Sequence, residues 1–158
     1  MVYVFDSNSF GVISYYFPER FPSFWKSFNG LVADGRILSV REVYLELENR
    51  LPENRQHMLN WIVANRNVFL VPGPEETKFV SQIFAVSHFQ QLVKTKQTLI
   101  GSPVADPFII ASAKIRNGCV VTEEGKKDNS ARIPNVCDHF AVACINVEKF
   151  MERESMQF

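Results

Sequence analysis

Residues 2–6 read Val-Tyr-Val-Phe-Asp, an apolar run that ends at a carboxylate. Apolar side chains on both faces of such a short run predict a strand buried on both sides, as the inner strands of a parallel sheet are. A second run, Cys-Val-Val-Thr at 119–122, ends directly before Glu123 and Glu124. We therefore expect a sheet in which at least two strands lead into acidic residues.

Strands and helices alternate along the rest of the chain. Further strands are predicted at 36–39, 68–71 and around 144–146, and helices at 9–16, 19–33, 40–50, 53–66, 75–94, 106–117 and the C-terminus. Residues 95–104 are polar and contain Gly and Pro, which predicts a loop, and Gly35 and Gly118 are predicted to end helices. Such alternation is typical of βαβ units, in which helices cover both faces of a parallel sheet. The chain is therefore expected to be an α/β protein.

Length and composition limit the class of protein. A chain of 158 residues suits one domain over 1–158. No apolar run approaches the ~20 residues of a membrane-spanning helix, and the N-terminal residues lack the pattern of a signal peptide, so we expect a cytoplasmic protein that does not enter a membrane. Seventeen basic and seventeen acidic residues cancel, which argues against binding of nucleic acid by charge alone. Three cysteines without a C-x-x-C pair are interpreted as buried thiols rather than zinc ligands.

Carboxylates occur where a parallel sheet binds ligands, beyond the carboxyl ends of its strands. Asp6 follows the first strand, and Glu123 and Glu124 follow the strand at 119–122. Asp106 begins the helix that leads into that strand. Each acid also has a structural alternative: the aspartates suit helix caps, and the glutamates suit solvated surface charges. Their joint placement is what favours a functional cluster.

The helix at 40–50 supplies a further carboxylate, either Glu42 or Glu46. The two lie one helical turn apart and therefore on one face. At ~100° per residue, Glu46 lies about 110° from the centre of the apolar stripe and Glu42 about 150° from it. We expect Glu46 to border the core and keep Glu42 as the alternative.

Clustered carboxylates are typical ligands of Mg²⁺ or Mn²⁺, which prefer oxygen donors. Without a cation, two unit charges ~4 Å apart repel by about 4 kcal/mol at an effective dielectric constant of ~20. A bound ion activates water and stabilises the leaving oxygen when a phosphodiester is hydrolysed. The neutral net charge is compatible with this chemistry, because the ions themselves attract the phosphate.

Four segments together resemble the PIN-domain nucleases. They are Asp6-Ser-Asn8, Ser39-Val-Arg-Glu-Val-Tyr-Leu-Glu-Leu47, Asp106-Pro-Phe-Ile-Ile-Ala-Ser-Ala-Lys114 and Val120-Val-Thr-Glu-Glu124, in the family's order over nearly the whole chain. The resemblance implies a three-layer α/β/α sandwich with a central parallel sheet of four to five strands, Mg²⁺ or Mn²⁺, and endonuclease action on RNA. It further implies a toxin of a bacterial toxin–antitoxin pair, with an antitoxin as partner, and it is compatible with a homodimer.

The resemblance also assigns roles to residues. Asp6, Glu46, Asp106 and Glu124 correspond to the catalytic, metal-binding acids. Thr122 corresponds to the hydroxyl beside the metal, and Asn8 to the polar residue after the first aspartate. The family commonly has Asp at the position of Glu124, so the neighbouring Glu123 and Asp128 are supporting candidates for this acid. Glu42 is a supporting candidate as the alternative to Glu46. Basic residues near these acids in the sequence are candidates for phosphate contacts: Lys94, Lys96, Lys114, Arg116, Lys126, Lys127 and Arg132.

Hydrolysis of RNA is the leading hypothesis. The first alternative is a catalytically inactive PIN-like module that binds RNA or a protein, which Glu124 in place of Asp and the neutral charge both favour. The second is a nuclease that acts on DNA, because metal chemistry and phosphate contacts hardly distinguish the two sugars.

Overall fold

The computed structural model describes residues 1–92 and 104–158. Within this part of the chain, five strands form one sheet in the order β3-β2-β1-β4-β5, and every neighbouring pair is parallel. The strands are β1 (Tyr3–Phe5), β2 (Ile37–Val40), β3 (Phe69–Leu70), β4 (Cys119–Val121) and β5 (Ala143–Ile145). The N-terminal strand is thus the central one, as its apolar sequence predicted.

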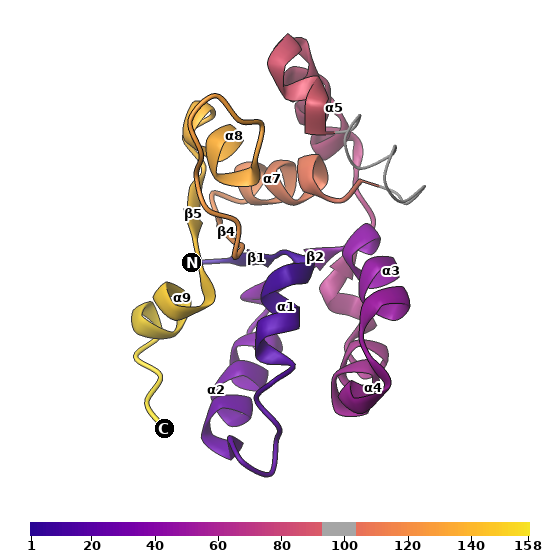
Figure 1. The fold of residues 1–158 in the computed structure, drawn as a ribbon, viewed down its shortest axis with the longest axis vertical. Helices are drawn as coiled ribbons and strands as arrows, with labels where there is room; N and C mark the ends of the chain where they lie inside the picture. The colour runs from indigo at the N-terminus through magenta and orange to yellow at the C-terminus, as the bar shows by residue number, and fades with distance from the viewer. Residues whose placement is uncertain (93–103) are drawn as a thin grey trace.

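Helices cover both faces of the sheet (Figure 1). On one face lie α5 (Pro74–Ala85), α7 (Asp106–Ile115) and α8 (Ile133–His139). On the other lie α1 (Ser7–Ile13), α2 (Pro22–Ala33), α3 (Arg41–Arg50), α4 (Gln56–Ala64) and α9 (Val147–Arg153). Short 3-10 turns are η1 (Glu53–Arg55), η2 (Arg66–Val68) and η3 (Ser87–Gln90). The expected three-layer α/β/α sandwich with a parallel sheet is confirmed.

The predicted strands are found, and two helical regions differ from expectation. The helix expected at 75–94 ends at Ala85 and is followed by the turn η3, while residues 93 and 94 lie outside the described residues. The loop expected at 95–104 lies almost wholly outside them as well. The helix α8 was not predicted from the sequence.

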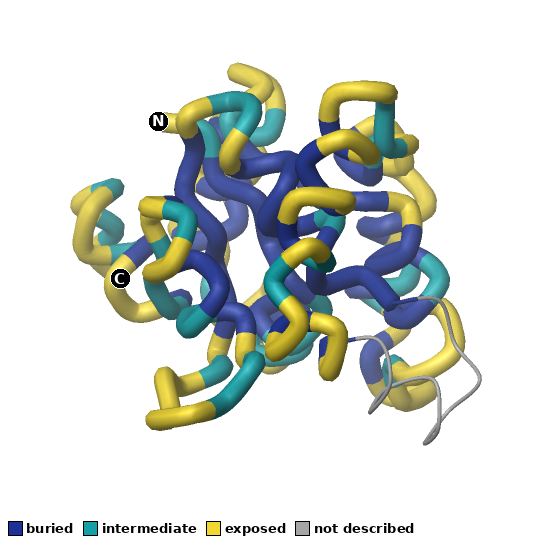
Figure 2. The backbone as a smooth tube through the Cα atoms, turned by 90° about the horizontal axis from the view of Figure 1, so that it is seen from above, coloured by how far each residue is buried: buried dark blue, intermediate teal, exposed yellow. Residues whose placement is uncertain are grey.

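The core is built around aromatic side chains that meet β1. The ring of Phe5 lies 5.4 Å from that of Phe10, 5.6 Å from Phe28 and 5.1 Å from Phe150, measured between centroids. All four side chains are completely buried. Because helices cover both faces, the inner strands β1 and β4 are buried along their whole length, whereas the edge strand β5 is partly exposed. The outer surfaces of the helices are exposed (Figure 2).

The end of α7 corrects one prediction. Gly118 was expected to take the left-handed conformation that ends the helix, but Asn117 takes it, with a φ of 48°. The N–H of Gly118 then donates to Ala113 O at 2.8 Å, which satisfies a carbonyl of the last turn. Gly118 itself meets a different constraint, because a Cβ there would lie 2.8 Å from Val2 O, beside β1. Gly35 behaves as predicted, with a φ of 68° after α2.

The helices of the described segments are too short and too polar to cross a bilayer. The three cysteines are free thiols, with Cys119 and Cys137 buried and Cys144 half-buried. Burial raises the pKa of the Cys119 thiol to about 11, so this thiol remains protonated at neutral pH. The predicted buried thiols are confirmed for Cys119 and Cys137.

Candidate functional site

Asp6 is held at the carboxyl end of β1 by hydrogen bonds from two segments. Its Oδ1 accepts from the backbone N–H of Ser7 at 2.7 Å, which makes Asp6 the N-cap of α1. Its Oδ2 accepts from the hydroxyl of Thr122 at 2.9 Å. Thr122 follows β4, and the parallel pairing of β1 with β4 brings the two strand ends together. The capping role considered for Asp6 is therefore confirmed, and the contact with Thr122 is added to it.

Asn8 joins the same group. Both Nδ2 and Oδ1 of its amide lie 3.3 Å from Thr122 Oγ1, and its Oδ1 accepts from the N–H of Glu123 at 3.0 Å. Thr122 Oγ1 also accepts from the N–H of Glu124 at 3.2 Å. The side chains of Asp6, Asn8 and Thr122 therefore fix the path of the backbone just beyond β4.

Asp106 and Glu124 line one cavity of about 240 Å³, together with Ser130 and Arg132. Asp106 stands in the first turn of α7 and is 2% exposed. The N-cap of that helix is Ala105, so the alternative of Asp106 as N-cap is wrong. Glu124 reaches the cavity from the loop after β4, and its Oε2 accepts from the N–H of Ile133 at 3.0 Å. Two of the four predicted acids thus share a cavity.

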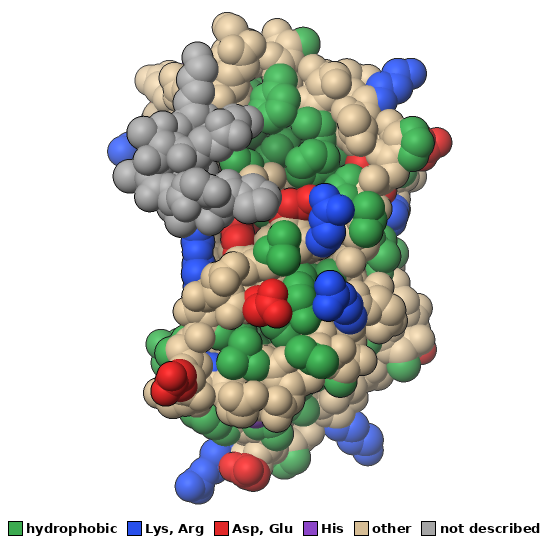
Figure 3. Space-filling model, turned by 90° about the vertical axis from the view of Figure 1, so that its right-hand side faces the viewer, with side chains coloured by type: hydrophobic (Ala, Val, Ile, Leu, Met, Phe, Trp, Pro, Cys, Tyr) green, Lys and Arg blue, Asp and Glu red, His purple; other side chains and the backbone are tan. Residues whose placement is uncertain are grey.

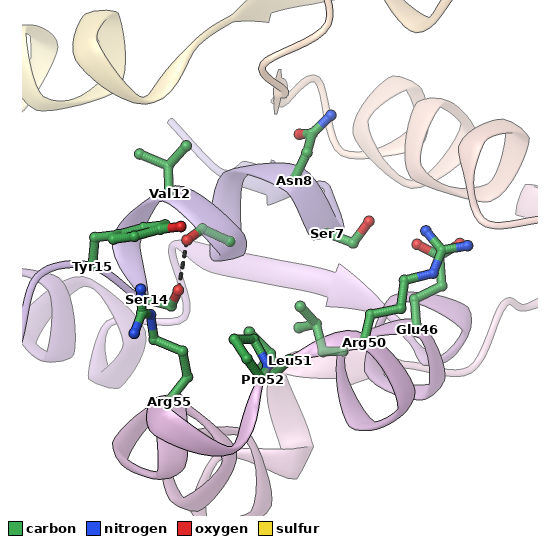
Figure 4. Close-up of a pocket in the computed structure, with 12 residues that line it drawn as sticks. Ser7, Asn8, Val12, Ser14, Tyr15, Glu46, Arg50, Leu51, Pro52 and Arg55 are labelled. Atoms are coloured by element: carbon green, nitrogen blue, oxygen red, sulfur yellow. Dashed lines mark hydrogen bonds between the residues drawn. The ribbon is translucent and has the colours of Figure 1, made fainter.

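Glu46 lines a different cavity, of about 370 Å³, with Ser7 and Asn8 from α1 (Figure 4). Both glutamates are buried, and Glu42 is slightly more buried than Glu46, at 5% against 8% exposed, so the expectation that Glu46 is the one closer to the core is wrong. The reason is that α3 packs against α1 and α4 as well as against β2 and β3, which covers more of its surface than one apolar stripe. Glu42 Oε1 accepts from Arg41 at 2.9 Å, and its buried Oε2 has no hydrogen-bond donor among the residues that the structure describes.

The two neighbouring glutamates after β4 serve helices on opposite faces of the sheet. Glu123 Oε1 accepts from the N–H of Val147 at 2.8 Å, at the start of α9, whereas Glu124 serves the start of α8. Asp128 is exposed in the loop between β4 and α8. The structure therefore brings Glu124, but not Asp128, into the cavity of Asp106.

The basic candidates have separate environments. Arg132 lines the cavity with Asp106, whereas Arg116 pairs with Glu76 at 2.9 Å and Lys126 pairs with Asp138 at 2.7 Å. Lys114 Nζ donates to Phe140 O at 2.9 Å, and the Lys127 side chain is exposed. Lys94 and Lys96 lie outside the described residues.

A family model described as a domain of unknown function, DUF4411, matches residues 3–158. The chain belongs to the DUF4411 family. No curated protein and no solved structure matches it. The arrangement of acids in this DUF4411 chain must therefore be judged from its own geometry.

The donor set of this DUF4411 domain allows a test of whether a divalent cation fits. In the segments 1–92 and 104–158, no group of three or more His, Cys, Asp and Glu side chains is close enough to hold a metal ion. Mg²⁺, however, is commonly bound by one or two carboxylates, with water and substrate phosphate completing its shell. Asp106 and Glu124 in a shared cavity fit that mode of binding. The four-ligand cluster, and Mg²⁺ or Mn²⁺ itself, stay predictions.

Charged side chains also gather on the face that carries α3 and α5, where Figure 3 shows acidic groups next to Lys and Arg in the narrow middle of the molecule.

Close to the acids after β4, burial and the carboxylate of Glu123 raise the pKa of Tyr16. Arg55, for which the sequence predicts no role, is 8% exposed and lines the same cavity as Glu46. Arginine is rarely buried without a partner, so the sequence alone gave no signal for it.

Proposed function

We propose that this DUF4411 domain is a metal-dependent endoribonuclease whose metal-binding carboxylates are Asp106 and Glu124. The observation that supports this is their shared cavity, built from the first turn of α7 and from the loop after β4. The cavity lies beyond the carboxyl end of β4, where parallel sheets bind ligands. The resemblance of four sequence segments to the PIN-domain nucleases supports the same reaction.

The residues around the cavity would have three roles: binding of the metal, binding of the phosphate and positioning of Glu124. Asp106 and Glu124 would hold Mg²⁺ or Mn²⁺, which supplies positive charge for a phosphoryl oxygen and lowers the pKa of a bound water. Arg132 lines the cavity and can donate two hydrogen bonds to a phosphate. The side chains of Asp6 and Asn8 form hydrogen bonds with the Thr122 hydroxyl. The oxygen of that hydroxyl accepts from the backbone N–H of Glu124 at 3.2 Å. These three are positioning residues for Glu124.

The test is an RNA cleavage assay with Mg²⁺, with Mn²⁺ and with EDTA. The variant Asp106→Asn removes one metal-binding charge, and Asp128→Asn makes the same chemical change at an exposed position of the loop between β4 and α8. We expect cleavage that needs the metal, is lost in Asp106→Asn and is kept in Asp128→Asn. Cleavage in EDTA, or at the wild-type rate in Asp106→Asn, would refute the proposal. A DNA strand of the same sequence, assayed in parallel, separates RNA from DNA as substrate.

If the enzyme is also a toxin, its expression in bacteria should arrest growth. The arrest should be relieved by Asp106→Asn but not by Asp128→Asn. An antitoxin would be a protein that binds this domain and restores growth. Wild-type growth during expression of the active enzyme would argue against the toxin.

A binding module without catalysis is the second candidate. It is favoured because Glu123 and Glu124 already bind the starts of α9 and α8, and because the described residues hold no three-ligand group. Calorimetry with Mn²⁺ separates the two candidates. Heat that disappears in Asp106→Asn supports the enzyme, and a silent titration supports the binding module.

A further inference from the structure

The cavity of about 370 Å³ lies between α1, α3 and the segment that follows α3, from Leu51 to Arg55 in η1. Figure 4 shows Arg55 and Tyr15 at one end of it and Arg50 and Glu46 at the other. The side chain of Ser7 extends toward the end that holds Glu46. The cavity therefore has one end with a cation and an aromatic ring, and one end where an acidic side chain accompanies a basic one.

The guanidinium of Arg55 is buried against two aromatic rings. Its guanidinium carbon lies 4.1 Å from the centroid of the Tyr15 ring and 5.3 Å from that of Phe17. Within residues 1–92 and 104–158, its buried Nε has no hydrogen-bond acceptor, and its Nη1 makes a long bond of 3.4 Å to Asn54 O. No carboxylate of the described segments forms an ion pair with it. Because burial of an unpaired charge is costly, this end of the cavity favours an anionic ligand.

The surroundings of Arg55 suit a phosphate that carries a flat ring. A guanidinium matches the oxygens of a phosphate with two parallel hydrogen bonds. Tyr15 is 64% exposed, so part of its ring remains open to a base, and stacking on an aromatic side chain is the usual way in which proteins hold bases of single strands. Glu46 lies at the far end, which keeps its negative charge away from the anion.

Asn8 connects this cavity to the proposed active site. It lines the cavity of Arg55, and its amide contacts Thr122, whose hydroxyl holds the N–H of Glu124. Glu124 in turn lines the cavity of Asp106. The two cavities are thus linked by the contacts of Asn8 with Thr122 and of Thr122 with the N–H of Glu124.

We propose that the cavity of Arg55 binds one nucleotide, with its phosphate on Arg55 and its base against Tyr15. This inference deepens the proposed function and rests on it for the source of the nucleotide, which is a single strand of RNA that also reaches Asp106 and Glu124. A free nucleoside monophosphate has the same chemistry, so the experiment includes both.

The experiment measures the fluorescence anisotropy of a labelled 2′-O-methyl oligouridine strand, which resists cleavage, with EDTA present so that binding does not require a metal. Uridine monophosphate and inorganic phosphate serve as competitors. The variants are Arg55→Gln and Tyr15→Ser. Because Tyr15 is exposed, Tyr15→Ser should fold and test the site even if the loss of the buried Arg55 side chain unfolds Arg55→Gln. The control is Arg66→Gln, because Arg66 is exposed and lies over the Tyr44 ring at 4.5 Å, away from the cavity.

We expect Arg55→Gln and Tyr15→Ser each to weaken strand binding by about tenfold or more, and Arg66→Gln to leave it unchanged. Displacement by uridine monophosphate at lower concentration than by inorganic phosphate supports recognition of the base as well as the phosphate. Binding that both cavity variants retain within about twofold, or a wild type that binds neither strand nor nucleotide, overturns the inference. Because no cleavage is measured, loss of binding in the cavity variants supports this site even where the wild type fails to cleave RNA, and that outcome refutes only the nuclease.

Discussion

Thr122 donates its hydroxyl hydrogen to Oδ2 of Asp6 at 2.9 Å, across the carboxyl ends of the paired strands β4 and β1. Both side chains are almost fully buried, at 1% and 3% exposed. The hydroxyl therefore donates a hydrogen bond to one oxygen of a buried carboxylate. It also ties together two segments that are 116 residues apart in the chain.

Replacement of Thr122 by Val should remove this bond with little change of shape. We expect Thr122→Val to lower the free energy of unfolding by about 1–3 kcal/mol, because the buried carboxylate of Asp6 loses the hydrogen bond from the Thr122 hydroxyl. Thr77→Val is the control, since the Thr77 hydroxyl bonds to Gly73 O on an exposed turn of α5. Urea unfolding of the two variants measures the difference, and equal losses would show that the Asp6 contact adds nothing.

The sequence predicts the sheet because each strand can be recognised from its own few residues. Short apolar runs such as those ending at Phe5 and Val121 leave few alternatives to buried strands. The helix α8 was missed because its seven residues, which include Pro134, have a weak pattern of their own. Its start is completed by Glu124 Oε2, which accepts from Ile133 N over a separation of nine residues. Such a cap depends on the fold of the loop and has no local signature.

The site was predictable only where strand ends determine position. Asp6 and Thr122 meet because β1 and β4 are parallel neighbours. That Glu46 and Asp106 line different cavities could not be foreseen, because it depends on how α3 packs against α1. Burial of Arg55 depends on the placement of the Tyr15 and Phe17 rings over its guanidinium, which the sequence does not show.

Gly118 offers a test of the junction between α7 and β4. A methyl group at this position would lie 2.8 Å from Val2 O, so backbone would have to move. We expect Gly118→Ala to destabilise the protein by about 1–3 kcal/mol, as other changes that overfill a packed site do. Gly30→Ala is the control: a Cβ there meets nothing within 4 Å, and inside α2 it should stabilise by about 0.5–1 kcal/mol. Thermal unfolding of both variants checks the opposite signs.

Tyr3 should make stability depend on alkaline pH. Burial and the hydrogen bond from its hydroxyl to Glu154 at 2.5 Å raise the pKa of Tyr3 to about 12. A pKa raised in the folded state contributes stability that is present below the ordinary tyrosine value of about 10 and is lost as pH rises through the folded value.

Tyr3→Phe should therefore narrow its stability gap to the wild type as pH rises from about 10 to 12. Urea unfolding across this range measures the gap. Tyr15→Phe, at a position that is 64% exposed, is the control and should follow the wild-type pH dependence. A constant gap between Tyr3→Phe and the wild type would contradict the role of the Glu154 contact.

The ion pair between Glu76 of α5 and Arg116, which directly follows α7, should act in acid. Burial alone would raise the pKa of Glu76, but the hydrogen bond from Arg116 at 2.9 Å and the N–H of Gly73 at 3.1 Å outweigh it, so this pKa is lowered. A lowered carboxyl pKa contributes stability that is present above the unfolded value of about 4.3 and is lost as pH falls through the folded value.

At pH 7, Glu76→Gln should cost about 1–2 kcal/mol of unfolding free energy, and the loss should shrink as pH falls below about 4. Glu75→Gln, an exposed neighbour in the same helix, should show neither effect. Urea unfolding of both variants at several pH values measures these losses. If the loss for Glu76→Gln stays the same in acid, the charge of Glu76 does not stabilise the contact between α5 and the end of α7.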